Sequence, residues 1–226
     1  MARPSPVNGR TARLTRDRIV DAVVDLLESG GVDAVTTRTV GDALGVHPTA
    51  LYRHFRDMDE LIREAADHIL EGLIEPTSAD EDADPFQAVF TLCLRLRNTL
   101  MSHPGAASGV ASGPSRMPHE RVFTEQMLHL LSHAGLADED VVMAYHALIE
   151  FTVGSSAIDA PGPTTESDEE ARHRAWRADY LTAPPEDFPV TVRVAPQLYP
   201  SQDAQFQYGL RALVEGLRIK VASPTR

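Results

Sequence analysis

The stretch that decides the fold is TTRTVGDALGVHPTALYRHF, residues 36–55. Thr36 suits the N-cap of a first short helix, because its hydroxyl can accept a backbone N–H that has no partner inside the helix. Gly45 can end that helix in the left-handed conformation, and Pro48 can open a second helix, where its missing N–H is not needed. The pattern therefore predicts two short helices joined by a tight turn.

The second of these helices is too short to stand alone, since a helix of about seven residues does not persist in water. Leu51 and Phe55 must therefore pack against other elements, which leaves an outward face. That face carries Thr49, Ala50 and Arg53, with Tyr52 and His54 on its flanks. A helix-turn-helix that places its second helix in the DNA major groove explains both features. A purely structural helix-turn-helix stays open as the alternative on this pattern alone.

The motif sits within a longer pattern whose order and spacing are specific. An amphipathic helix precedes it, and an acidic helix start follows it. The segments that carry the pattern are LLESGGVDAVT (26–36), VGDALGV (40–46), LYRHF (51–55) and DELI (59–62). Residues 14–73 therefore resemble the DNA-binding domain of the TetR family of transcriptional regulators.

The resemblance implies an all-α protein: an N-terminal three-helix helix-turn-helix DNA-binding domain and a larger helical ligand-binding and dimerisation domain. It implies a regulator without enzyme activity or cofactor, a repressor that binds a palindromic operator in double-stranded DNA as a homodimer. A small-molecule inducer would release it. The residues expected to contact DNA are Thr37, Arg38, His47, Pro48, Thr49, Ala50, Tyr52, Arg53, His54 and Arg56.

Two positions depart from the family pattern. Gly41 stands where alanine is usual, and glycine should loosen the first helix of the motif. Met58 stands where a phosphate-contacting lysine is common, and Arg56 is the candidate to replace that contact.

The composition is that of an ordinary soluble protein, with 42% hydrophobic and 24% charged residues in a chain of 226. No run approaches the roughly 18 apolar residues of a membrane span, and the basic N-terminus lacks the apolar core of a secretory signal. The single cysteine, Cys93, excludes an internal disulfide framework. These features predict a cytoplasmic protein.

The net charge of −12 is unevenly divided along the chain. Residues 1–56 hold eight arginines against six acids, a net of +2, so the remaining 170 residues carry −14. This asymmetry would turn the N-terminal face toward DNA. An acidic surface that serves only solubility explains the second half equally well.

The chain divides into a flexible basic arm (1–14), the helix-turn-helix domain (15–56), a connecting helix (57–75) and a helical ligand-binding and dimerisation domain (76–226). The arm holds Arg3, Arg10 and Arg13, and Arg16 follows it. These arginines suit phosphate or minor-groove contacts, although a terminus that touches nothing is an equally simple reading. Thr15 caps the first helix, and Asp57 with Glu60 fits a capping box before the connecting helix, about 58–73.

Apolar periodicity predicts five helices in the second half, at about 85–103, 120–134, 138–159, 169–181 and 201–221. Between the last two lies a proline-punctuated loop, 184–200. Its segment VTVRV (190–194) has strand propensity but no obvious strand partner. No segment forces a sheet, so the predicted fold class is all-α.

Two readings explain the large helical body. In one, it binds a small ligand through adaptable apolar and aromatic side chains; in the other, it is a solid dimerisation body regulated by a protein partner or by thiol oxidation. The ligand-binding candidates are Phe90, Leu94, Met101, Met127, Tyr145, Ile149 and Trp176. The dimerisation candidates on the last helix are Phe206, Leu210, Leu213 and Leu217.

Other chemistry has little support. The chain lacks a P-loop, a dinucleotide glycine pattern and a nucleophile elbow. His129 and His133 have a zinc-compatible spacing, but no third ligand follows, so no metal site is predicted. Cys93 lies in an apolar helix, where burial would raise its thiol pKa and make it inert.

Overall fold

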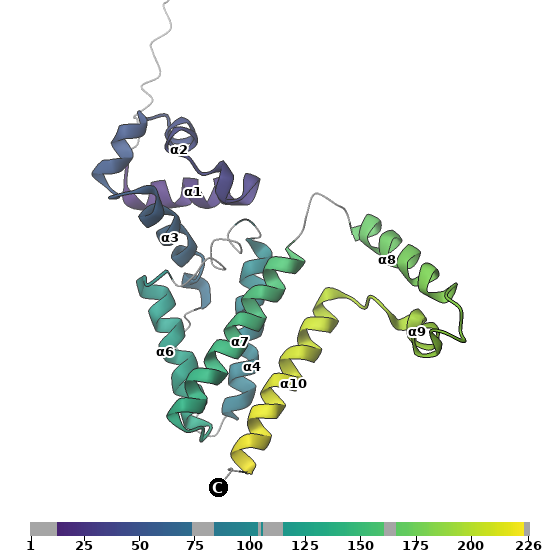
Figure 1. Cartoon of the computed structure of the whole chain (residues 1–226). Helices are drawn as coiled ribbons and strands as arrows, with labels where there is room; N and C mark the ends of the chain where they lie inside the picture. Colours follow the sequence, from purple (N-terminus) through teal and green to yellow (C-terminus); the bar gives the residue numbers. More distant parts are fainter. Residues whose placement is uncertain (1–12, 74–83, 104, 106–114, 161–165, 224–226) are drawn as a thin grey trace, which may run out of the picture.

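The computed structural model describes residues 13–73, 84–103, 105, 115–160 and 166–223 (Figure 1). Every regular element in these ranges is helical, which confirms the predicted all-α class. The buried apolar side chains form two cores, one in an N-terminal head and one in a larger body.

The head consists of three α-helices and two short 3₁₀ segments around one core. Ile19, Val23 and Leu27 of the first helix are buried together with Val40 and Leu51 of the helix-turn-helix. The elements are α1 (Arg16–Gly30), η1 (Val32–Ala34), α2 (Thr37–Leu44), η2 (Pro48–Arg53) and α3 (Met58–His68).

The local signals in the head act largely as predicted. The Thr15 hydroxyl accepts the Arg18 N–H, and Thr36 caps α2. Gly45 ends α2 in the left-handed region at φ 66°. The Asp57 side chain accepts the Glu60 N–H at 2.7 Å.

In the capping box predicted at Asp57 and Glu60, the reciprocal contact of Glu60 is displaced by one residue. The Glu60 carboxylate accepts the backbone N–H of Arg56 at 2.8 Å, one residue before the N-cap. The Glu60 side chain thereby holds the residue just before the N-cap of α3.

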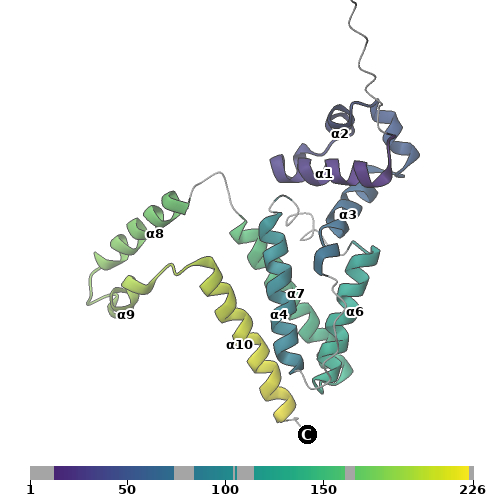
Figure 2. The same cartoon turned by 180° about the vertical axis from the view of Figure 1, so that it is seen from behind.

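The body is built on four packed helices. In Figure 2, α4 lies between α6 and α10, and α7 packs behind it. Their buried faces meet at Leu96, Leu100, Met127, Leu148 and Leu210. The helices are α4 (Pro85–Ser102), α6 (Pro118–His133), α7 (Asp138–Asp159) and α10 (Gln202–Ala222).

An arm projects from the body between α7 and α10, as both ribbon views show. It comprises α8 (Glu166–Leu181), α9 (Pro189–Val194) and η4 (Ala195–Gln197). The prediction of a loop over 184–200 is corrected, because residues 189–194 form helix α9 despite their strand propensity. Pro189 supplies the fixed φ of a first helical position, and no neighbouring strand is present among the described residues to accept a ladder.

The connecting helix is also shorter than predicted. Helix α3 ends at His68, and Glu71–Leu73 forms the 3₁₀ segment η3. Ile69 packs in the head core, whereas Leu70 and Leu73 pack in the body core. The chain therefore passes from one core to the other within a single turn.

Helix α7 is the one described helix that is long and apolar enough to cross a membrane by those two criteria. It packs against α4, α6 and α10. Val141, Leu148 and Val153 are buried there, whereas Met143 and Ile158 are exposed. Gly209 of α10 permits one of these contacts, since a Cβ there would lie 2.5 Å from the Phe151 ring. The missing side chain at Gly209 thus lets α10 approach α7 closely within the protomer.

An ion pair between α4 and α10 yields a pH prediction. The Asp84 side chain caps α4 and lies 2.6 Å from Arg218, and the Arg218 guanidinium lowers the pKa of Asp84 from its ordinary 3.8. A lowered folded-state pKa gives stability that is present above the unfolded pKa and lost as pH falls through the folded one. Asp84→Asn should therefore lower the Tm at about pH 6, and the difference from the wild type should shrink toward about pH 3. Thermal melts across this range measure it, and a pH-independent difference would contradict the assignment.

Candidate DNA-binding head and its junction with the body

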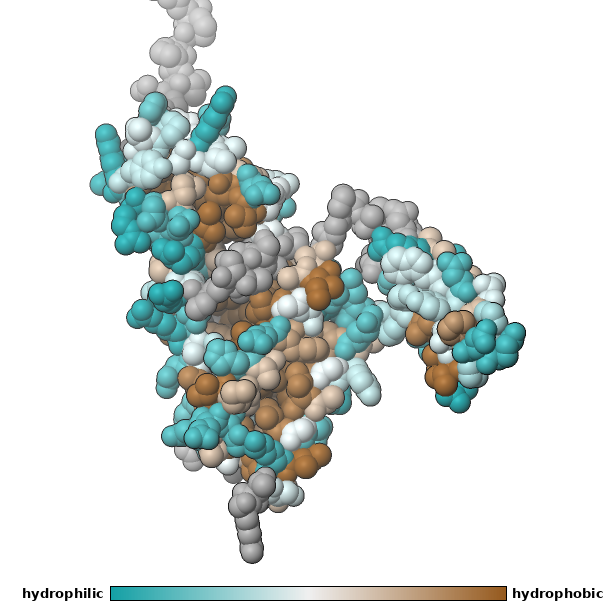
Figure 3. All heavy atoms as spheres, in the orientation of Figure 1, coloured by the Kyte–Doolittle hydropathy of each residue, from teal (hydrophilic) through white to brown (hydrophobic). Residues whose placement is uncertain are grey.

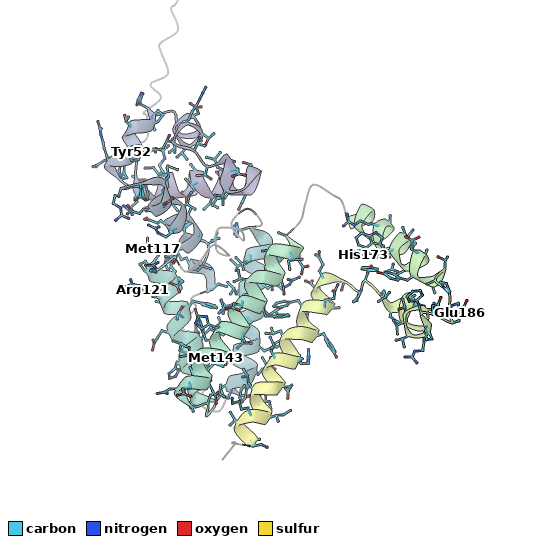
Figure 4. The ribbon with its side chains drawn as sticks, viewed as in Figure 1. Tyr52, Met117, Arg121, Met143, His173 and Glu186 are labelled. Carbon is cyan, nitrogen blue, oxygen red and sulfur yellow. The ribbon has the colours of Figure 1, made fainter. Side chains whose placement is uncertain are left out.

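The recognition segment is a 3₁₀ helix, Pro48–Arg53, rather than the α-helix that the sequence suggested. His47 is its N-cap, and the His47 Nδ1 lies 2.8 Å from the Thr49 hydroxyl. The structure buries Leu51 and leaves Thr49, Tyr52 and Arg53 exposed, while Pro48, Ala50 and His54 are partly exposed. The segment thus presents a mixed polar face beyond the head core (Figure 4).

Arg16 braces this segment from behind. Its guanidinium forms ion pairs with Glu64 and, at 2.9 Å, with Glu60. It also donates to the His54 carbonyl and lies 4.3 Å from the centre of the Phe55 ring. The Glu64 carboxylate raises the pKa of Arg16 above its ordinary value. The suggestion that Arg16 follows phosphates with the N-terminal arm is therefore corrected: it is committed to holding α1, α3 and the recognition segment together.

The other candidate DNA contacts lie around this segment. Arg38 is exposed on α2, with Asp42 at 3.8 Å, and Thr37 beside it is partly buried. Arg56 is exposed and donates to Asp57 at 2.9 Å. Met58 packs against the head core, consistent with an apolar rather than a phosphate-binding role. Arg3 and Arg10 lie outside the described residues.

Gly41 has a packing role that the sequence did not reveal. It is buried, and its carbonyl accepts the Val46 N–H at 2.9 Å. A Cβ at this position would lie 3.0 Å from the Val46 carbonyl oxygen and 3.3 Å from Pro48. The glycine lets α2 approach the turn closely, whatever helix propensity it loses.

The junction between head and body centres on a buried carboxylate, Asp67, near the end of α3. It accepts the backbone N–H of Glu120 at 2.8 Å and that of His119 at 3.1 Å, the first-turn donors of α6. The Ser115 hydroxyl also donates to it. Asp67 therefore caps a body helix from the head side. Sequence reasoning missed it; the only signal was one acid within the otherwise apolar run AADHIL (65–70).

A second contact crosses the same junction. His103, the C-cap of α4, forms an ion pair with Glu28 near the end of α1. The body thus touches the head both through α3 and through α1.

Arg97 of α4 is a buried cation at the root of the arm. Its side chain is 1% exposed and lies 2.8 Å from Asp159, the last residue of α7, and 3.4 Å from Asp203, in the first turn of α10. The guanidinium also stacks 4.5 Å from the centre of the Phe206 ring. One side chain therefore ties together the helix that enters the arm and the helix that leaves it. The prediction of this helix from its apolar residues did not identify Arg97.

The seven predicted ligand-binding residues do not form one group. Phe90 of α4 lies under the Arg211 guanidinium of α10, whereas the Tyr145 hydroxyl of α7 lies 3.0 Å from Thr124 of α6. Leu94 and Ile149 are partly buried against the body core, Met127 is fully buried in it, and Met101 is partly exposed. Trp176 lies in the projecting arm, where it contacts His173 and Tyr199. It therefore does not lie with the other six candidates in the body.

The predicted dimerisation residues face inward. Phe206 and Leu210 are 2% and 0% exposed within the protomer, and Leu213 and Leu217 are partly buried against the same core. These side chains stabilise the attachment of α10 to its own body. The surface that α10 leaves open is carried instead by Tyr208 and Ile219.

Cys93 and the histidine pair offer no further chemistry. Burial raises the pKa of the Cys93 thiol to about 12, which leaves it protonated and unreactive. This removes the support for regulation by thiol oxidation. His129 and His133 stack with ring centres 6.2 Å apart, and across the described ranges no three His, Cys, Asp or Glu side chains gather into a metal-binding group.

Comparison with known proteins agrees with this architecture. Residues 19–65 match the family described as "Bacterial regulatory proteins, tetR family", and residues 77–221 match "Tetracyclin repressor-like, C-terminal domain". The class D tetracycline repressor protein of Escherichia coli is 27% identical over 216 residues, which cover 94% of this chain and 93% of that protein.

Two solved structures are also similar. ActR of Streptomyces coelicolor, in complex with actinorhodin, is 25% identical with a TM-score of 0.80, over 94% of this chain and all of that one. BioQ of Mycobacterium smegmatis, in a structure with its double-stranded DNA operator, is 28% identical with a TM-score of 0.63, over 91% of this chain and 99% of that one. By its two matched domains, which together cover most of its length, the chain belongs to the TetR family of transcriptional regulators.

Proposed function

We propose that this regulator is a homodimeric repressor that binds a palindromic operator and is released by a small molecule held in its body. The relatives supply a precedent for each part: an operator complex of BioQ, a small-molecule complex of ActR and the repressor proteins for tetracycline. The residues of this chain supply the rest of the support.

An exposed apolar face on α7 and α10 supports the homodimer. On α7, Met143 is 69% exposed and Ile158 also faces out; on α10, Ile219 is 66% exposed and Tyr208 is exposed as well. In Figure 3 apolar side chains gather over this side of the body, and Figure 4 labels Met143 there. Two such helix pairs related by a two-fold axis would form a four-helix interface.

Small residues on the same two helices fit this arrangement. A Cβ at Gly154 of α7 or at Gly216 of α10 would meet nothing within 4 Å. The two helices therefore have room for a partner backbone to approach closely. We place the dimer contact on this exposed face rather than on Phe206 and Leu210.

The ligand would lie among α4, α6 and α7. We retain Leu94, Met101, Met127, Tyr145 and Ile149 as candidate contacts, since these helices pack on one another in the body. The Tyr145 hydroxyl, paired with Thr124, offers one polar group within an otherwise apolar environment, which is the usual make-up of small-molecule sites.

The observation that carries the proposal is the Asp67 cap. Helix α3 belongs to the head core, yet its Asp67 holds the first turn of α6, the helix that also bears Met127. A ligand that moves α6 must therefore either move α3 or break the cap. Because one operator fixes one separation between recognition segments, a ligand that favours another separation weakens DNA binding, and DNA weakens ligand binding by the same factor.

The DNA contacts give a separate prediction. Thr49→Ala removes the hydroxyl that lies beside His47 and should relax sequence preference, whereas Tyr52→Phe should weaken all sites alike. Affinity should fall with salt at a log–log slope of about −0.9 per neutralised phosphate. Oligonucleotide selection followed by binding titrations at several salt concentrations measures all three. Binding that ignores salt, or a selection that yields no motif, would count against the proposed DNA surface.

The proposed function itself is tested on the selected operator. Compounds that raise the Tm of the protein are first identified, and the operator complex is then titrated with one of them. We expect operator affinity to fall by roughly 5–150-fold at saturation. Unchanged operator affinity with a saturated body would show that the protein is not an inducer-released repressor.

A further inference from the structure

The recognition segment begins with a histidine ring that is engaged on one side. His47 is the N-cap of η2, and its Nδ1 accepts the backbone N–H of Thr49 at 3.4 Å. The same Nδ1 lies 2.8 Å from the Thr49 hydroxyl. Within the described ranges no protein group bonds to the other ring nitrogen, Nε2, and the side chain is exposed. The ring is therefore held through Nδ1 while Nε2 faces outward.

These contacts determine which ring nitrogen carries the proton. A backbone N–H can only donate, so the Nδ1 of His47 presents its lone pair to Thr49. A neutral imidazole has one N–H, which is therefore on Nε2. The Thr49 hydroxyl directs its proton to the same lone pair and so favours this tautomer. His47 thus offers a hydrogen-bond donor at Nε2 and has no ring acceptor left.

This donor lies at the end of the segment where helix-turn-helix proteins contact bases. In such proteins the N-terminal residues of the second helix meet base edges in the major groove. Residues 46–50 have the sequence VHPTA, in which only His47 and Thr49 have side chains that can donate. The Thr49 hydroxyl is used by Nδ1. A side-chain donor for a base at this end of the segment is therefore supplied by His47.

A single fixed donor distinguishes bases by the acceptors that they present. In the major groove guanine offers two acceptors, N7 and O6. Adenine places an amino donor beside its N7, cytosine offers an amino donor, and thymine places a methyl group beside its O4. Guanine is thus the base that an N–H donor fits best. A contact to a phosphate, by contrast, would carry no sequence information.

We propose that the Nε2–H of His47 donates to N7 of a guanine in each half-site of the operator, and that Thr49 positions the ring for this contact. The proposal deepens the proposed function and rests on its operator binding. It also gives a reason for the relaxed sequence preference expected of Thr49→Ala. Without the hydroxyl, the ring can turn or exchange its tautomer, and the donor is no longer fixed.

Selection from a random double-stranded oligonucleotide library tests the proposal with the full-length protein. We expect the wild-type motif to contain a guanine, at symmetric positions of the two half-sites, that His47→Ser no longer prefers. Serine is a good N-cap, so this variant keeps the start of η2. His129→Ser removes an exposed histidine from α6 of the body and is the matched control. It should return the wild-type motif.

A base analogue identifies the atom that is contacted. 7-Deazaguanine replaces N7 by carbon and still pairs with cytosine. At the His47-dependent position of one half-site it should weaken wild-type binding by about 5-fold, the lower end of the range for a base contact. His47→Ser should bind the two operators equally. Thr49→Val, which lacks the hydroxyl, should lose most of the 5-fold difference, whereas Thr49→Ser should keep it.

The possible roles of His47 give different results. An unchanged motif in His47→Ser would show that the ring serves only as an N-cap. Full wild-type affinity for the 7-deazaguanine operator, with an equal loss for all sequences in His47→Ser, would assign the ring to a phosphate. Either result, or a His47-dependent preference for a base other than guanine, overturns the proposal while operator binding stands. A wild-type selection that yields no motif would instead contradict the proposed function itself.

Discussion

Met143→Glu should convert the protein into a monomer that no longer binds its operator at concentrations where the wild type is saturated. Met143 is exposed on α7, on the face that we propose for the dimer. A carboxylate there would be buried without a partner in the interface, at a cost of several kcal/mol. Since a monomer holds only one half-site, operator affinity should fall by roughly 100-fold or more.

Val122→Glu is the matched control. Val122 is a half-exposed apolar residue on α6, a helix outside the proposed interface, and a charge there can reach solvent. Analytical ultracentrifugation and operator titration compare the two variants, and circular dichroism checks that both remain helical. A Met143→Glu protein that sediments as a dimer would place the interface on another surface.

The head was predictable from the sequence because its signals are local. Thr36, Gly45 and Pro48 set the limits of two short segments through capping and backbone preferences that need no distant partner. The apolar spacing that predicts burial of Leu51 and Phe55 is equally local. What this spacing could not give is the 3₁₀ form of the recognition segment, since a helix of 6 residues is too short to distinguish the α-helical from the 3₁₀ period.

The residues that sequence reasoning missed, or to which it gave another role, make contacts over long distances in the chain. Arg16 meets Glu64 across 48 positions, Asp67 meets Glu120 across 53, and Arg97 meets Asp203 across 106. No periodicity marks such pairs, because each partner alone resembles a solvated charge.

On α10, the sequence did not show which of two helix faces packs within the protomer and which is exposed. A helix packed on both sides is apolar on two faces, and the cleaner stripe, at Phe206 and Leu210, belongs to the protomer core. The face that we propose for a second protomer contains Tyr208, Ala212 and Gly216 and so looks less apolar than the inner one. Small residues that favour close helix approach are poorly weighted by hydrophobicity alone.

Asp67→Asn should uncouple ligand binding from DNA binding while both activities persist. The two carboxylate oxygens of Asp67 receive N–H donors from separate residues, His119 and Glu120, so an amide must turn its NH₂ group toward one of them. The lost bond should cost about 1–3 kcal/mol of stability, which corresponds to a Tm decrease of roughly 2–10 °C for a chain of this size. Glu125→Gln, which neutralises an exposed acid of α6, is the control and should stay within about 0.5 kcal/mol of the wild type.

The decisive measurement is the factor by which a bound compound weakens operator binding. In the wild type we expect a factor of roughly 5–150. In Asp67→Asn it should approach one, because α6 can then move without pulling α3, although each ligand still binds its own site. Reciprocity supplies an internal check: saturating operator should weaken compound binding in the wild type by the same factor and should have little effect in the variant. If Asp67→Asn keeps the full factor, then another contact couples ligand binding in the body to DNA binding by the head. The Glu28–His103 ion pair between α1 and α4 is then the next contact to test, by His103→Gln.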